Sequence, residues 1–225
     1  MIFQTEWFSP FTLLAAALLT AVLLAATARR AWRAFARYKS AAALACVILA
    51  TAWCLNATPD SGHLAGMNYH LLAVNLTALM IGAPAAWWLG VLLLFPYTVL
   101  FGGGWQAVPL NALALLLPAL AVNLAARAWV NRLPANIFIF IFLNGFLASA
   151  AGMMVTGLVL VGVLDWANAF SDGVLWSTAF PVFFLISWAE AFLSGITTAI
   201  FVALRPQWLN TFDDGRYLKA ENKIW

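Results

Sequence analysis

Long apolar runs separated by short polar segments fill most of this chain. They predict membrane-spanning helices, because about 20 apolar residues in a helix cross a hydrocarbon core of about 30 Å. The shortest of the predicted spans covers residues 69–82, and a helix of that length would extend only about 20 Å. If only five helices spanned the membrane, residues 69–101 would form one re-entrant unit. We predict an all-α polytopic membrane helix bundle, a single transmembrane domain over residues 1–225, with spans near residues 11–28, 41–56, 69–82, 84–101, 110–128, 137–163 and 175–204.

The basic residues indicate how these spans are oriented. All eleven Lys and Arg residues fall in segments 29–39, 127–132 and 205–225, which lie on one side of a seven-span bundle. The positive-inside rule makes that side cytoplasmic. The N terminus is therefore predicted outside and the C terminus in the cytoplasm. The expected parts are a basic inner segment 29–39, outer loops 57–68, 102–109 and 164–174, and a cytoplasmic tail 205–225.

The composition agrees with a multi-pass protein of the cell inner (plasma) membrane whose main surroundings are lipid. Hydrophobic residues make up 65% of the chain and charged residues only 8%, against about 25% charged in soluble domains. The net charge of +3 follows from topology, so no nucleic-acid partner is expected. Cys46 and Cys54 share one apolar span and are expected to be small core residues rather than a disulfide. The sequence indicates no oligomeric state.

No motif pairs a nucleophile with a base, since GxSxG and HExxH are both absent. An enzyme is not expected.

Glu190 is the sharpest polar feature, because a carboxylate near the bilayer centre costs about 3 kcal/mol on insertion scales. It must face the bundle interior. Either it belongs to an ion path or substrate site, or it is a structural hydrogen-bond acceptor for a backbone group or for Asn111 or Asn144. Both interpretations remain open, and these three residues form the candidate intramembrane path.

Both histidines lie close together before the third span. His63, Met67 and His70 are spaced by four and three residues, which would place them on one face of a helix. Imidazole and thioether ligands suit copper, and imidazole alone also suits nickel, cobalt and zinc. The alternative is that each side chain caps or packs at the membrane surface. No resident cofactor is expected; a transition-metal ion would be the substrate.

Three consecutive glycines, Gly102, Gly103 and Gly104, end the fourth span. Such a run lets the backbone approach a ligand or another segment closely. It is not a phosphate-binding loop, because no Gly-Lys-Ser/Thr follows. The alternatives are a loop near the substrate and a simple turn.

Several motifs together resemble the CbiM/NikM family, the membrane substrate-capture proteins of cobalt and nickel energy-coupling-factor (ECF) transporters. The resemblance rests on His70-Leu71-Leu72 with the later Gly82-Ala83-Pro84-Ala85-Ala86, on Phe8-Ser9-Pro10, on Phe101-Gly102-Gly103-Gly104 through Asn111, and on Glu190 within AEAFLSGITTA. It implies seven helices with an outside N terminus. It also implies a separate transmembrane scaffold protein and cytoplasmic ATPases as partners.

The chain departs from this family at position two. Family members bind metal through the N-terminal amine, a histidine at position two and a histidine after the second helix. Here position two is Ile2, and only His70 matches the later histidine. Metal binding by His70 would then need help from His63, Met67 or Met1.

Two hypotheses follow. The first is a metal-uptake component that captures its ion from the outer face. The second is a membrane-embedded assembly or interaction subunit on the same scaffold, without metal transport. A third hypothesis is proton-linked transport through Glu190.

Overall fold

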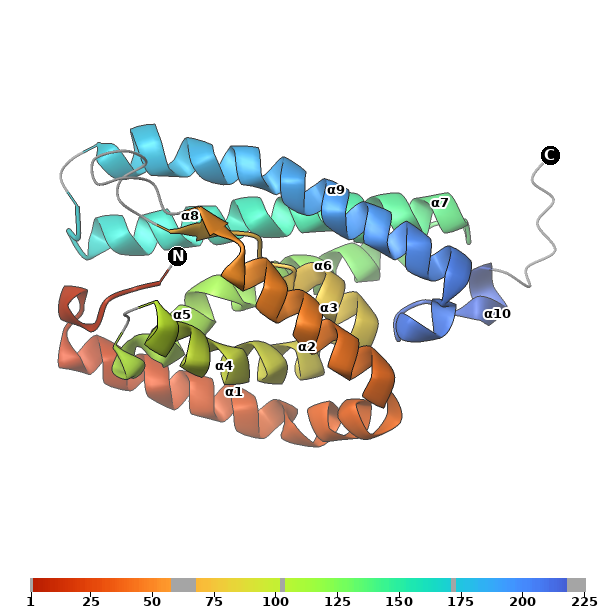
Figure 1. The fold of residues 1–225 in the computed structure, drawn as a ribbon, viewed down its shortest axis with the longest axis horizontal. Coiled ribbons are helices and arrows are strands. Elements are labelled where there is room, and N and C mark those ends of the chain that lie inside the picture. Colours follow the sequence, from red (N-terminus) through yellow and green to blue (C-terminus); the bar gives the residue numbers. More distant parts are fainter. Residues whose placement is uncertain (1, 58–67, 102–103, 171–172, 218–225) are drawn as a thin grey trace.

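The computed structural model describes residues 2–57, 68–101, 104–170 and 173–217. They form a bundle of roughly parallel and antiparallel helices, with the N-terminal segment at one end and α10 at the other (Figure 1). The first part of the chain contains η1 (Thr5–Trp7), α1 (Pro10–Arg37), α2 (Lys39–Cys54), β1 (Asn56–Ala57), β2 (Tyr69–His70), α3 (Val74–Ile81) and α4 (Ala83–Leu100). The second part contains η3 (Trp105–Ala107), α5 (Val108–Leu115), α6 (Leu117–Val130), α7 (Ile137–Ile139), η4 (Phe140–Leu147), α8 (Ala148–Trp166), η5 (Leu175–Ala179), α9 (Phe180–Leu204), η6 (Pro206–Trp208) and α10 (Asp214–Tyr217).

The apolar runs became helices, as predicted. Within the described residues, five helical segments are long and apolar enough to cross a membrane, and α2 is a shorter apolar helix. The first begins where expected, because Pro10 occupies its first turn and the Ser9 hydroxyl accepts a hydrogen bond from the Thr12 amide at 3.2 Å. This helix does not stop at residue 28. It continues through the basic segment to Arg37, so most of residues 29–39 are helical.

The predicted helix over residues 69–82 is wrong in its first half. Tyr69 and His70 form β2, which pairs antiparallel with β1, and α3 covers only Val74–Ile81. Eight residues extend about 12 Å, too little to cross a bilayer. The predicted boundary between spans 69–82 and 84–101 is confirmed, because Gly82 has φ 85° and separates α3 from α4.

Other boundaries differ in detail. The span predicted at 110–128 is interrupted at Leu116, between α5 and α6, where Pro118 follows. The π-helical segment η4 joins α7 to α8 without a break. The prediction of two core cysteines is also wrong, because Cys46 is half-buried and Cys54 is exposed at the end of α2, both as free thiols.

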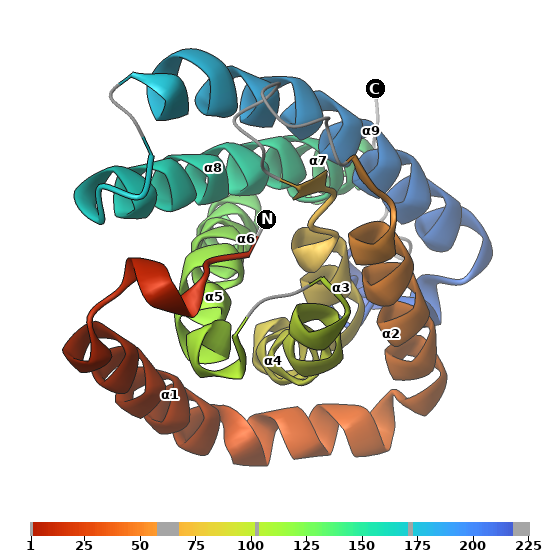
Figure 2. The same ribbon diagram turned by 60° about the vertical axis from the view of Figure 1, so that its left-hand side comes forward.

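The short α3 lies inside the bundle. It packs against α2, α4, α6 and α8, and all eight of its residues are buried. Figure 2 shows it surrounded by other helices, with the N-terminal segment entering the same interior. The long pair α8 and α9 packs along one side, and α1 packs on α4 and α5 along another.

The exterior of the bundle is far more apolar than that of a soluble protein, around an interior that is also largely apolar. Large apolar side chains are exposed along α1 and α9, including Phe11, Leu18, Val22, Leu185, Phe192 and Ile196. Asparagines and a glutamate are buried inside: Asn75, Asn111, Asn123, Asn144 and Glu190. Lipid accepts such an apolar exterior, while polar groups at membrane depth must find partners within the protein.

The tight packing of α8 against α9 gives the first prediction. A Cβ on Gly157 would lie 2.6 Å from Cβ and Cγ of Phe183, whereas a Cβ on Gly162 of the same helix would meet nothing within 4 Å. We expect Gly157→Ala to destabilise the purified protein by about 1–3 kcal/mol and Gly162→Ala to be neutral or mildly stabilising. Thermal unfolding in detergent measures both. Equal melting temperatures for the two variants would contradict this packing.

Candidate metal-capture site

The connection from β2 to α3 is the centre of the candidate site. Residues 71–73 are neither strand nor helix, and Ala73 takes the left-handed conformation with φ 53°. A turn of this kind at membrane depth exposes backbone polar groups that need partners. Those partners come from α2 and α9.

Glu190 of α9 holds the amides of this turn. Its Oε2 accepts a hydrogen bond from the Leu72 amide at 2.9 Å, and its Oε1 accepts one from the Ala73 amide at 2.8 Å. The side chain is 3% exposed. A carboxylate just before the first turn of α3 also interacts favourably with the positive end of the helix dipole. Glu190 thus fastens the start of α3 to α9.

The carbonyls of the turn are also bonded. Trp53 Nε1 of α2 donates to the Leu72 carbonyl at 3.0 Å, and the Ala73 carbonyl accepts from the Thr77 amide at 3.0 Å. The β1–β2 pairing joins Asn56 to His70. The turn is therefore fixed from three directions, and this fixes the backbone of His70.

His70 presents a bare nitrogen to the interior. Its Nδ1 lies 2.9 Å from the Leu71 carbonyl, which can only accept a hydrogen bond, so the proton belongs on Nδ1. Nε2 then carries a lone pair, and it is buried without a partner among the described residues. The ring is 5% exposed and packs edge-on to Tyr97, with centroids 5.3 Å apart. This tautomer with an unused Nε2 is the form in which histidine binds metals.

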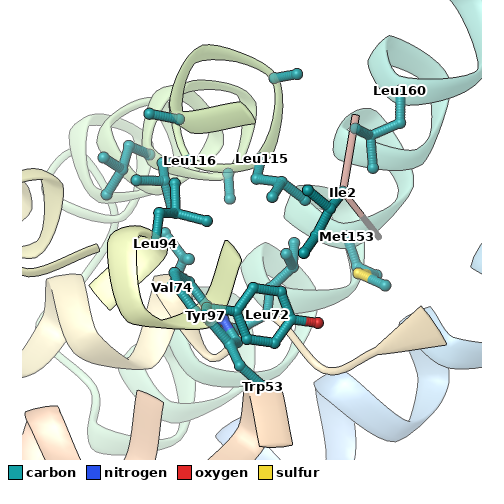
Figure 3. Packing of buried hydrophobic residues seen from close by; sticks show 14 of the residues in the cluster. Ile2, Trp53, Leu72, Val74, Leu94, Tyr97, Leu115, Leu116, Met153 and Leu160 are labelled. Atoms are coloured by element: carbon teal, nitrogen blue, oxygen red, sulfur yellow. The ribbon is translucent and has the colours of Figure 1, made fainter. Parts of the chain in front are cut away.

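The N-terminal segment enters the bundle beside this turn. The Phe3 amide donates to Asn111 Oδ1 at 2.7 Å, and Asn111 Nδ2 donates back to the Phe3 carbonyl at 3.3 Å. Phe3 is fully buried and Ile2 is 8% exposed. Figure 3 shows Ile2 near Leu115 and Met153, in the same apolar cluster as Leu72. The amide of Asn111 therefore holds the N-terminal segment inside the bundle.

Comparison with known proteins decides the family. The model of the CbiM family, described as the cobalt uptake substrate-specific transmembrane region, matches residues 3–208. The chain belongs to the CbiM family. This confirms the resemblance read from its motifs. As a CbiM-family protein, it is a multi-pass, substrate-specific transmembrane component of a transition-metal uptake transporter, and it is not an enzyme.

Two solved structures share the fold. A crystal structure of a truncated transition-metal transporter matches with a TM-score of 0.67 and 19% identity, covering 90% of this chain and 99% of that one. A second structure of a transition-metal transporter gives a TM-score of 0.67 and 19% identity, with coverage of 91% and 93%. No curated protein sequence matches this CbiM-family chain.

Glu190, Asn111 and Asn144, the residues of the predicted intramembrane path, each bind a different part of the chain. Glu190 accepts hydrogen bonds from the backbone amides of Leu72 and Ala73, as one of the two interpretations expected, while Asn111 and Asn144 are not its partners. Asn111 holds Phe3. The backbone carbonyl of Asn144 accepts a hydrogen bond from Asn75 Nδ2 at 2.8 Å.

The histidine–methionine group is only partly described. His63, Met67 and Met1 lie outside the described residues, as do Gly102 and Gly103. The expectation of one helical face is wrong for His70, which lies in a strand. Gly104 does allow a close approach, since a Cβ there would overlap Thr5 Oγ1 of the N-terminal segment. The glycine run therefore meets another part of the chain at this position.

Three buried residues in and around the candidate site were not predicted from the sequence: Trp53, Asn75 and Met153. Trp53 is 1% exposed, and its indole nitrogen donates a hydrogen bond to the Leu72 carbonyl of the turn. Asn75 is the hub of a buried network. It donates to Ser149 Oγ at 2.7 Å and accepts from Asn123 at 2.7 Å. Asn75 could have been identified from the sequence, because an asparagine within an apolar run indicates a buried polar contact.

The two hydrogen bonds between Glu190 and the turn give a second prediction. In Glu190→Gln, one carboxylate oxygen is replaced by an amide nitrogen, so the Leu72 or Ala73 amide loses its acceptor. We expect a loss of about 1–3 kcal/mol in stability and faster hydrogen exchange at those two amides. Glu6→Gln, at an exposed glutamate, is the matched control and should change neither. Unchanged protection of Leu72 and Ala73 in Glu190→Gln would rule out this role.

Proposed function

We propose that this CbiM-family chain captures a transition-metal ion from the outer face, with His70 Nε2 as a ligand and the ion as its transported substrate. The observation that carries the proposal is the buried lone pair of His70, fixed by the Nδ1 contact to Leu71. A buried acceptor without a partner costs about 1–3 kcal/mol. A metal ion would satisfy it.

Glu190 and Asn111 serve this function as positioning residues. Glu190 fixes the turn that carries His70, and Asn111 holds the N-terminal segment beside it. Both Glu190 oxygens already accept backbone hydrogen bonds. This favours positioning over the proton-carrier role considered for the same residue.

The proposed orientation has the N terminus outside and the C terminus in the cytoplasm. A second buried apolar cluster supports it, because this cluster joins Ala31 of the basic helix end to Leu209 and Phe212 of the tail. Arg216 also donates to the carbonyls of Asn131 and Leu133 at 3.0 and 3.1 Å. The three basic segments therefore gather at one end, as the positive-inside rule requires. In Figure 1 this end is opposite the N-terminal segment.

Energy for uptake would come from separate ECF partners, a transmembrane scaffold protein and cytoplasmic ATPases. Family membership supports this assignment. The exposed arginines Arg29, Arg30, Arg33 and Arg37 on α1 place a positive surface at the proposed cytoplasmic end. We propose this surface as the docking face for acidic partner segments.

The proposal is tested by the metal content of protein purified from metal-replete cells. We expect close to one equivalent of transition metal in the unmodified chain. His70→Phe keeps an aromatic ring against Tyr97 but removes the lone pair, and should lower the metal affinity at least about tenfold. His63→Ala removes the other histidine, so comparing the two variants shows which histidine binds the metal.

Matching melting temperatures for His70→Phe and the unmodified protein would exclude misfolding as the cause. A full metal equivalent in His70→Phe would refute His70 as a ligand. Metal lost only in His63→Ala would move the site to the outer loop.

A further inference from the structure

We propose that Met153 supplies a second ligand beside His70, and that the pair selects a soft monovalent cation, copper(I), as the captured ion. This inference rests on the proposed function and adds the class of metal. It assigns a role to a methionine in the first third of α8, which the sequence motifs do not mark.

The supporting observation is a small cavity of about 10 Å³ between β2, α5, α8 and α9. That volume is close to the space that one water molecule occupies, so a dehydrated ion fits and a hydrated one does not. His70 and Met153 both line it, and Met153 is 2% exposed. The other lining residues are Tyr69, Leu72, Leu115, Leu160 and Phe183.

The donors available favour copper(I). His70 provides a neutral imidazole nitrogen and Met153 a thioether sulfur, a soft pair that suits copper(I). The described residues contain no group of three or more His, Cys, Asp or Glu side chains that could hold a metal. Nickel(II) or cobalt(II) would leave several coordination positions facing leucine and phenylalanine.

Charge favours the same ion. The cost of moving an ion into an apolar cavity rises with the square of its charge, so a monovalent ion is penalised about four times less than a divalent one.

The surroundings of Met153 are apolar. Ile2 of the N-terminal segment packs in the apolar cluster that contains Met153 and Leu115 (Figure 3). This segment therefore places an aliphatic side chain, with no nitrogen or oxygen donor, near Met153.

The test measures copper(I) affinity of the full-length chain in detergent, anaerobically and with a reductant, by competition with a chromophoric copper(I) chelator. Silver(I) serves as a redox-stable second probe, and nickel(II) and cobalt(II) are titrated in parallel. Met153→Leu keeps side-chain volume but removes the sulfur. Met154→Leu, at the neighbouring half-buried methionine that does not line the cavity, is the matched control.

We expect one bound copper(I), a drop of at least about tenfold in affinity for Met153→Leu, and no change for Met154→Leu. X-ray absorption should show a sulfur neighbour of copper that is lost only in Met153→Leu. If Met153→Leu binds copper(I) as tightly as the unmodified chain, or if nickel(II) or cobalt(II) binds more tightly than copper(I), this inference is overturned while His70 stands. If the unmodified chain binds none of these metals, the proposed function fails as well.

Discussion

The structure depends on how a helix can begin inside a membrane. Helix α3 starts deep in the bundle, where its leading amides have no water to bond. The Glu190 carboxylate satisfies the Leu72 and Ala73 amides just before it. At the other end, the Asn210 and Thr211 amides donate to the Met80 and Leu79 carbonyls. A half-length helix can thus be buried because α9 and the tail cap both of its ends.

The same arrangement creates the chemistry of the site. A full transmembrane helix through residues 69–82 would bond its own backbone and leave no turn. The interruption frees the Leu71 carbonyl to accept a hydrogen bond from the protonated Nδ1 of His70, which leaves Nε2 without a proton. Asn111 brings the N-terminal segment to the same region. Two buried polar side chains therefore fix the two segments of this region, Glu190 the turn that follows His70 and Asn111 the N-terminal segment.

The sequence predicted the parts of this protein that local patterns determine. Apolar run length gave the helices and the boundary at Gly82, and the motifs gave the family. The interruption of the third predicted span was missed because a short apolar run such as residues 69–73 is compatible with either a strand or a helix. The sequence left open which backbone group Glu190 binds, because the Ala73 amide lies 117 residues away along the chain. The role of Met153 depends on a cavity that only the packed helices define.

The protonation state of His70 tests the central claim most directly. With His63→Ala, His70 is the one remaining histidine of the chain, and ¹⁵N NMR of histidine-labelled protein can read its two ring nitrogens separately. The account predicts a protonated Nδ1 and a bare Nε2 near pH 7, with the Nε2 signal moving when copper(I) or silver(I) is added. A proton on Nε2, or an Nε2 signal indifferent to metal, would contradict it.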